Sequence, residues 1–259
     1  MNEAEKTEEA KKLAAGPLGE QMAKFPLLFA QPVFFGQRPS KNHPSEVRNG
    51  TISIVDLGEG PLAITCEHVI AGYCQMKETH DNLVFQIGNI EIDPIEQLID
   101  KDARLDLATI RLSKEQIEFI TSKGVIGSSV FRPKSWPPEI VKEGEFVSFG
   151  GFPGSLRSVV SFEEYIFDSW SCGGEKISSV SEGQFVSAFN RDYWVKSFGA
   201  AHHLTLDALG GLSGGPAFVN RGLYSDFVGI ISQYHVNFNA MFFSSASNLR
   251  INGTIIPLP

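Results

Sequence analysis

Short apolar runs rich in valine, isoleucine and phenylalanine follow one another along the chain from about residue 25 onward. Glycine, proline, asparagine or aspartate separates these runs about every ten residues, a spacing typical of strands joined by turns. The clearest runs read TISIVDLG, PLAITCEHVI, NLVFQIGNIEI, DLATIRL, EFVSFGGFPG, SVVSFEEYIF and DFVGIISQYH. The pattern predicts an all-β protein.

Two local signals stand out from the strand pattern. The stretch SKEQIEFITSKG predicts a single helix, because Ser113 is a residue type that caps helix N-termini and Gly124 would end the helix. Asn-Gly pairs at residues 49–50 and 252–253 open two strand-like runs, and this dipeptide is typical of tight turns with positive φ angles. Both pairs also match the N-glycosylation acceptor pattern, but the lack of a secretory signal favours turns.

The strand pattern divides the chain into segments. Residues 1–24 precede it and begin with a charged, helix-forming stretch that Gly16-Pro17 would end, so we expect an N-terminal arm. A polar, proline-rich segment without periodicity lies around residues 132–143. It predicts a linker between a first β lobe over residues 25–131 and a second β lobe over residues 144–259.

Composition and charge exclude several classes of partner. The 259 residues are 42% hydrophobic and include 30 acidic against 22 basic side chains, which gives a net charge of -8. No dense cluster of lysine and arginine is present, so nucleic acid is not an expected ligand. The early apolar run FPLLFAQPVFFG is too short to span a bilayer and is broken by Pro26 and Pro32. The sequence therefore predicts a soluble cytoplasmic protein with no membrane partner.

The cysteines agree with a reducing compartment. Cys66, Cys74 and Cys172 are odd in number and show neither a CxxC pair nor the Cys/His spacing of a zinc site. We expect free thiols and no metal.

The glycine-rich stretch LDALGGLSGGPAF, residues 206–218, is either a plain turn or the site of a nucleophile. Acyl transfer by serine needs a base that takes the hydroxyl proton, an acid that orients the base, and backbone donors for the oxyanion; it needs no metal or organic cofactor. Ser213 has glycines on both sides, which permit unusual backbone angles and bring N–H groups near its hydroxyl. His68 follows a strand-like run and Asp106 opens another. Taken singly, each of the three is more often structural.

Taken together, the segments TCEH, DLAT and GLSGGP contain His68, Asp106 and Ser213 in this order, and they resemble the motifs of trypsin-like, or chymotrypsin-fold, serine proteases. The resemblance covers roughly residues 30 to 250. VSFGGFPG and VGIISQYH are similar to segments of the bacterial branch, which includes HtrA-type and glutamyl-endopeptidase-like members. The resemblance to trypsin-like proteases implies two antiparallel six-stranded β-barrels with the active site in the cleft between them. It also implies a serine endopeptidase that acts through a Ser-His-Asp triad.

The same resemblance assigns further roles. The backbone amides of Gly211 and Ser213 would form the oxyanion hole, and Ser232 would brace Asp106. Residues 233–235, including Gln233 and Tyr234, would flank the specificity pocket. Asp207 stands six residues before Ser213, where members that cleave after arginine or lysine carry a carboxylate at the pocket floor. In this chain the Asp207 carboxylate would either select a substrate with a basic side chain or accept hydrogen bonds from within its own loop. Leu212 replaces the aspartate of zymogen-activated members, so we expect activity that does not depend on trimming of the N-terminus.

Two other readings of the serine segment stay open. GLSGG also fits the nucleophile elbow of α/β-hydrolases, but that fold needs a helix directly after the serine, and GGPAFVN is a poor helix start. The acid and histidine would then have to be Asp226 and His235, in the last part of the chain. The alternative to an enzyme is a non-catalytic, protease-like module that binds peptides. The expected partner is a protein or peptide substrate in the first case, with room for a regulatory partner protein.

Overall fold

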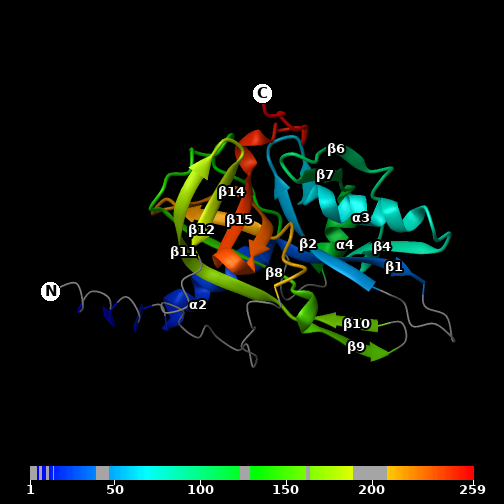
Figure 1. Cartoon of the computed structure of the whole chain (residues 1–259), viewed down its shortest axis with the longest axis horizontal. Coiled ribbons are helices and arrows are strands. Elements are labelled where there is room, and N and C mark those ends of the chain that lie inside the picture. The colour runs from blue at the N-terminus through cyan, green and yellow to red at the C-terminus, as the bar shows by residue number, and fades with distance from the viewer. Residues whose placement is uncertain are drawn as a thin grey trace.

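The computed structural model describes residues 5, 8–9, 12–13, 15–38, 47–122, 129–161, 164–188 and 209–259. Strands predominate and form two lobes that lie side by side (Figure 1). The predicted all-β protein is thus confirmed only as a mostly β protein, since a few helices are also present. The predicted helix end at Gly124 and the candidate pocket residue Asp207 lie outside the described residues. No helix in the described ranges is long and apolar enough to cross a membrane.

The first lobe is built on one antiparallel sheet of seven strands in the order β5-β4-β1-β2-β3-β7-β6. Their bounds are β1 (Ala30–Gln37), β2 (Val47–Asp56), β3 (Pro61–Thr65), β4 (Leu83–Ile87), β5 (Ile90–Glu91), β6 (Leu98–Asp102) and β7 (Leu107–Arg111). The expected closed six-stranded barrel is therefore wrong for this lobe. The edge strand β5 pairs with β4 and not with β6 among the described residues, and helix α4 packs beside it.

The second lobe is the closed six-stranded barrel that the resemblance implied, in the order β11-β12-β15-β14-β13-β8. Its strands are β8 (Phe146–Gly151), β11 (Trp170–Ser181), β12 (Gln184–Ala188), β13 (Pro216–Asn220), β14 (Ser225–His235) and β15 (Ala240–Ser245). A separate hairpin of β9 (Arg157–Ser161) and β10 (Glu164–Phe167) projects below the sheet of the first lobe (Figure 1). Short 3-10 turns are η1 (Pro26–Phe29), η2 (Gly154–Leu156), η5 (Val236–Phe238) and η6 (Ala246–Asn248).

Three helices complete the described fold: α2 (Pro17–Lys24), α3 (Glu67–Lys77) and α4 (Lys114–Ser122). Helix α4 is the predicted one, and the Gln116 N–H donates to the Ser113 hydroxyl at 3.2 Å as an N-terminal cap. The expectation of a single helix is wrong. Helix α2 begins at Pro17, where we expected a helix to end, and proline fits the first turn because that N–H has no helical partner. Helix α3 arises within a run that the sequence pattern assigned to a strand.

The two Asn-Gly pairs behave differently. Residues 252–253 lie in a turn as expected, and Gly253 has a φ of 87°. Residues 49–50 lie within β2 and pair with Phe34 and Val33 of β1, so the expected turn is wrong there. Glycine at position 50 relieves crowding instead, because a Cβ there would stand 3.1 Å from a Val69 methyl group and 3.2 Å from a Val33 methyl group, closer than ordinary contact. The glycine permits close packing of the sheet rather than a turn.

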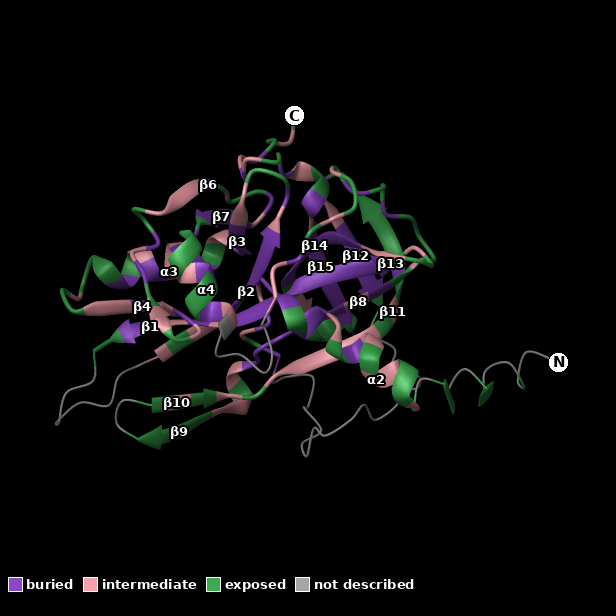
Figure 2. Ribbon diagram, turned by 180° about the vertical axis from the view of Figure 1, so that it is seen from behind, coloured by how far each residue is buried: buried purple, intermediate pink, exposed green. Residues whose placement is uncertain are grey.

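An aromatic cluster joins the two lobes. Phe218 of β13 is fully buried and contacts four other rings edge to face or tilted, with centroid separations from 4.9 to 5.7 Å; these rings belong to Phe25, Phe29, Phe131 and Phe227. Buried residues run continuously through both lobes at this junction (Figure 2). The cluster thus anchors β13, which begins directly after the glycine-rich serine segment, to the first lobe.

Candidate active site

The segment around Ser213 forms a tight loop between the lobes. The Gly214 N–H donates to the Ile231 carbonyl at 2.7 Å, and Gly214 has a φ of 92°. A Cβ on Gly214 would stand 2.0 Å from the Thr51 carbonyl oxygen, so only glycine fits. Strand β13 starts at Pro216, with no helix after the serine. The α/β-hydrolase reading is therefore wrong.

His68 and Asp106 form the closest polar pair of the site. His68 lies in the first turn of α3 and Asp106 directly precedes β7. The His68 Nδ1 atom is 2.9 Å from Asp106 Oδ2 and 3.0 Å from Oδ1, and the His68 backbone N–H donates to Oδ1 at 3.0 Å. Asp106 takes a left-handed φ of 51°, which is strained for a residue with a side chain. The carboxylate thus fixes both the ring and the backbone of His68.

The pair shifts both pKa values. The hydrogen bond to Asp106 raises the pKa of His68 above 6.5, against the opposing effect of burial, and the Asp106 and Glu67 charges add to the rise. Burial alone would raise the pKa of Asp106, but the hydrogen bonds and charge of His68 outweigh it, so the pKa of this carboxyl is lowered. At neutral pH Asp106 is ionised, so it favours the His68 tautomer that carries the proton on Nδ1 and leaves Nε2 free to accept one.

Replacing Asp106 by asparagine is expected to lower the pKa of His68, because the charged acceptor that favours the imidazolium is lost. NMR titration of the His68 ring should give a midpoint above 6.5 in the unmodified protein and a lower one in Asp106→Asn. The His80 ring, which contacts Met76 and Thr79 at the far end of α3, serves as the internal control. An unchanged His68 midpoint in Asp106→Asn would contradict the assignment of the pair.

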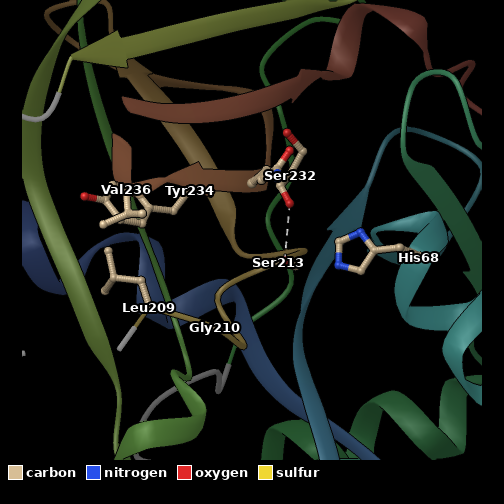
Figure 3. Close-up of a pocket in the computed structure, with 8 residues that line it drawn as sticks. His68, Leu209, Gly210, Ser213, Ser232, Tyr234 and Val236 are labelled. Atoms are coloured by element: carbon tan, nitrogen blue, oxygen red, sulfur yellow. Dashed lines mark hydrogen bonds between the residues drawn. The ribbon is translucent and has the colours of Figure 1, made fainter. Parts of the chain in front are cut away.

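His68 and Ser213 line one cavity of about 400 Å³ between the lobes. Figure 3 shows the imidazole of His68 facing the loop that carries Ser213. The Ser213 hydroxyl donates to the Ser232 carbonyl oxygen at 3.3 Å, and no hydrogen bond joins Ser213 to His68 among the described residues. Catalytic hydrogen bonds are often long or misaligned in the unliganded state, so the arrangement is compatible with a nucleophile and its base.

The two amides assigned to the oxyanion hole are oriented by the carbonyls at the other ends of their peptides. The Gly210 carbonyl accepts from the Gly154 N–H at 2.7 Å, and the Leu212 carbonyl accepts from the Gly215 N–H at 2.8 Å. Because a trans peptide is planar, these bonds fix the directions of the Gly211 and Ser213 N–H groups. Neither of these N–H groups donates to another atom of the described residues.

The expected contact between Ser232 and Asp106 is not what the structure shows. Ser232 lines the cavity instead, while the described hydrogen-bonding partners of the Asp106 carboxylate are His68 and the thiol of Cys66. The Cys66 thiol also donates to the Ile231 carbonyl at 3.1 Å. Sequence reasoning treated Cys66 only as a free thiol. Its position two residues before His68 was the available signal.

Cys66, His68 and Asp106 place three ligand-type atoms within 4.8 Å of one another. A metal-bound cysteine is a thiolate, whereas burial first and the Asp106 charge second raise the pKa of the Cys66 thiol well above its usual value. The donor set therefore suits a protonated thiol that supports Asp106 better than it suits a metal ligand. The absence of a metal site stays a prediction.

Gln233 and Tyr234 are the other described residues that the resemblance assigned to the substrate pocket. Gln233 and Tyr234 line the same cavity as His68 and Ser213, with the apolar side chains of Leu209 and Val236 (Figure 3). None of the described lining residues carries a carboxylate. A role for Asp207 in selecting a basic substrate side chain stays a prediction.

The chain is similar to several solved protease structures. The catalytically inactive tobacco etch virus protease complexed with substrate is 14% identical, with a TM-score of 0.45 over 87% of this chain and 80% of that chain. The thermostable serine protease AL20 from an extremophilic microorganism is 16% identical, with a TM-score of 0.45 over 85% and 91%. Protease Anisep from Arthrobacter nicotinovorans is 14% identical, with a TM-score of 0.44 over 86% and 92%.

No protein-family profile and no curated protein sequence matches the chain. The sequence identities of 14–16% and the TM-scores of 0.44–0.45 are both low.

Proposed function

We propose that the protein is a serine endopeptidase with Ser213 as nucleophile, His68 as general base and acid, and Asp106 as the orienting carboxylate. The observation that carries the proposal is the His68–Asp106 pair, held through both carboxylate oxygens and turned toward the cavity that Ser213 lines. The Gly211 and Ser213 amides on the same loop, which donate to no other atom in the described part of the chain, support it.

The proposed reaction follows from this geometry. The Ser213 hydroxyl oxygen attacks the carbonyl carbon of the peptide while His68 Nε2 takes the hydroxyl proton. Asp106 stabilises the imidazolium, and the Gly211 and Ser213 N–H groups donate to the oxyanion. Collapse of the intermediate breaks the C–N bond, and His68 returns the proton to the leaving amine. A water molecule then attacks the acyl carbon while His68 takes a proton from it. His68 returns this proton to the Ser213 oxygen as the acid product leaves.

Strand β14 supports an extended peptide as the ligand. Gln233 and His235 pair with Phe242 and Ala240 of β15, whereas the pairing of β14 with β13 ends at Ile230. The edge of β14 beside the cavity is thus not covered by β13, and an extended segment can add to such an edge through backbone hydrogen bonds. We also propose a reducing, cytoplasmic location, because all three cysteines are free thiols.

The second candidate is a peptide-binding module without catalysis. One observation favours this module: the Ser213 hydroxyl donates its hydrogen bond to the Ser232 carbonyl and not to the His68 ring. A mixed peptide library incubated with the unmodified protein and with Ser213→Ala separates the two functions. New peptide termini that form only with the unmodified protein establish the enzyme. Retention of peptides without cleavage by either form establishes the binding module.

A further inference from the structure

Polar groups of β2, in the first lobe, bind the carbonyl oxygens of the nucleophile loop in the second lobe. The Thr51 hydroxyl donates to the Gly211 carbonyl at 2.8 Å, and the Thr51 N–H donates to the Ser213 carbonyl at 2.9 Å. The Ser53 hydroxyl donates to the Gly214 carbonyl at 2.7 Å. The conformation of the loop therefore depends on a strand that contributes no group to the proposed chemistry.

The Thr51 hydroxyl also accepts the Phe152 N–H at 2.9 Å, so it is engaged both as donor and as acceptor. Thr51 is fully buried. Loss of this hydroxyl would leave the Phe152 N–H and the Gly211 carbonyl without partners in a place that water does not reach, and each such group is costly to bury unpaired. The hydroxyl thus bridges two segments of the second lobe, the nucleophile loop and the end of β8.

Gly211 is the residue whose geometry depends on this bridge. Its φ is 101°, and a Cβ would stand 2.4 Å from the Asn49 amide nitrogen and 2.8 Å from the Gly154 nitrogen. The peptide before Gly211 is held through the Gly210 carbonyl by Gly154, and the peptide after it is held through the Gly211 carbonyl by Thr51. With both planes held, the Gly211 N–H keeps one direction.

We propose that Thr51 is a positioning residue for the oxyanion site: its hydroxyl holds the peptide after Gly211 and so limits rotation about the Gly211 backbone. Together with the bond from the Gly154 N–H to the Gly210 carbonyl, this contact keeps the Gly211 N–H ready for the substrate oxyanion. The inference rests on the proposed function. A flip or motion of the peptide between Gly210 and Gly211 would turn the Gly211 N–H away and remove one of the two oxyanion donors. Loss of one such donor slows acyl transfer about 100- to 1,000-fold. Thr51 acts at one remove, so we expect a loss of at least about tenfold.

The test is the rate at which a fluorophosphonate probe modifies Ser213, compared between the unmodified protein, Thr51→Val and Thr51→Ser. Valine keeps the shape of threonine without the hydroxyl, and serine keeps the hydroxyl. We expect Thr51→Val to react at least about tenfold more slowly and Thr51→Ser to stay within about threefold of the unmodified protein. The pH at which reactivity falls should be the same in all three, because Thr51 contacts neither His68 nor Asp106.

Thr109→Val is the matched control, because Thr109 is also fully buried and donates to a glycine carbonyl, that of Gly253, at 2.7 Å. It should lose thermal stability without losing probe reactivity. If Thr51→Val does not fold, Thr51→Ala removes the same hydroxyl without adding a methyl group and replaces it in the comparison.

Equal reactivity of the hydroxyl-free variant and the unmodified protein would overturn the role of Thr51 while leaving Ser213 as nucleophile. An unmodified protein that reacts no faster than Ser213→Ala would overturn the proposed function, and the role of Thr51 with it.

Discussion

Replacing His68 by alanine is expected to reduce peptide hydrolysis on the order of 10⁴- to 10⁶-fold, because Ser213 then has no group that can take its proton. The fold should survive, since the side chain of His68 is 53% exposed and its loss leaves no buried cavity. The measurement is kcat/KM on a cleaved library peptide, with circular dichroism to verify folding.

The double variant of His68→Ala and Ser213→Ala sharpens this prediction. Groups that act as one unit are not additive, so the double variant should be about as inactive as either single variant. His80→Ala is the matched control, because His80 also lies near α3. Within the described part of the chain, the hydrogen bonds of its ring go to Met76 and Thr79 and not to the proposed site. Independent, multiplying losses from the two single substitutions would contradict a shared catalytic unit.

Replacing Phe218 by alanine is expected to lower the free energy of unfolding by about 3–5 kcal/mol, since it removes a fully buried ring from the centre of the interlobe cluster. Urea denaturation followed by intrinsic fluorescence measures the change. Phe146→Ala, at a side chain that is 61% exposed on β8, should change it by less than about 0.5 kcal/mol. Equal effects of the two substitutions would show that the cluster does not hold the lobes together.

The sequence predicted the parts of the fold that depend on local chemistry. Alternating apolar runs predicted strands, and the Ser113 cap predicted α4. Helix α3 was missed because its run, CEHVIAGYCQMK, has the β-branched pair Val69-Ile70 near its start. Its apolar and polar residues also separate only weakly onto opposite helical faces. Its buried side chains, Val69, Ile70, Tyr73 and Met76, nevertheless fall on one helical face.

Features that depend on contacts between distant segments could not be predicted. In the sheet of the first lobe, β5 pairs with β4 and β6 pairs with β7, and no pairing of β5 with β6 closes the sheet among the described residues. No local pattern encodes this long-range arrangement. Similarly, Asn49-Gly50 has the local signature of a turn, but the pairing of β2 with β1 and the proximity of Val69 decide its conformation. Tertiary packing overrides local preference at both places.

For the candidate site, the sequence grouped His68, Asp106 and Ser213. In the structure His68 contacts Asp106 directly, and His68 and Ser213 line one cavity. The sequence could not indicate that Cys66 contacts Asp106, or that Thr51 binds the Gly211 carbonyl 160 residues away. Buried hydroxyls and thiols have no sequence signature of their own, since their roles depend on which backbone groups the fold brings to them.

The central claim is that Ser213 is a nucleophile activated by His68. The most direct measurement is mass spectrometry of the protein after reaction with a fluorophosphonate, with peptide mapping of the adduct. We expect one covalent adduct, located on Ser213, with modification strongly slowed in His68→Ala and falling as the pH drops through the raised pKa of His68. No adduct on Ser213, or an adduct that forms equally fast in His68→Ala, would contradict the claim.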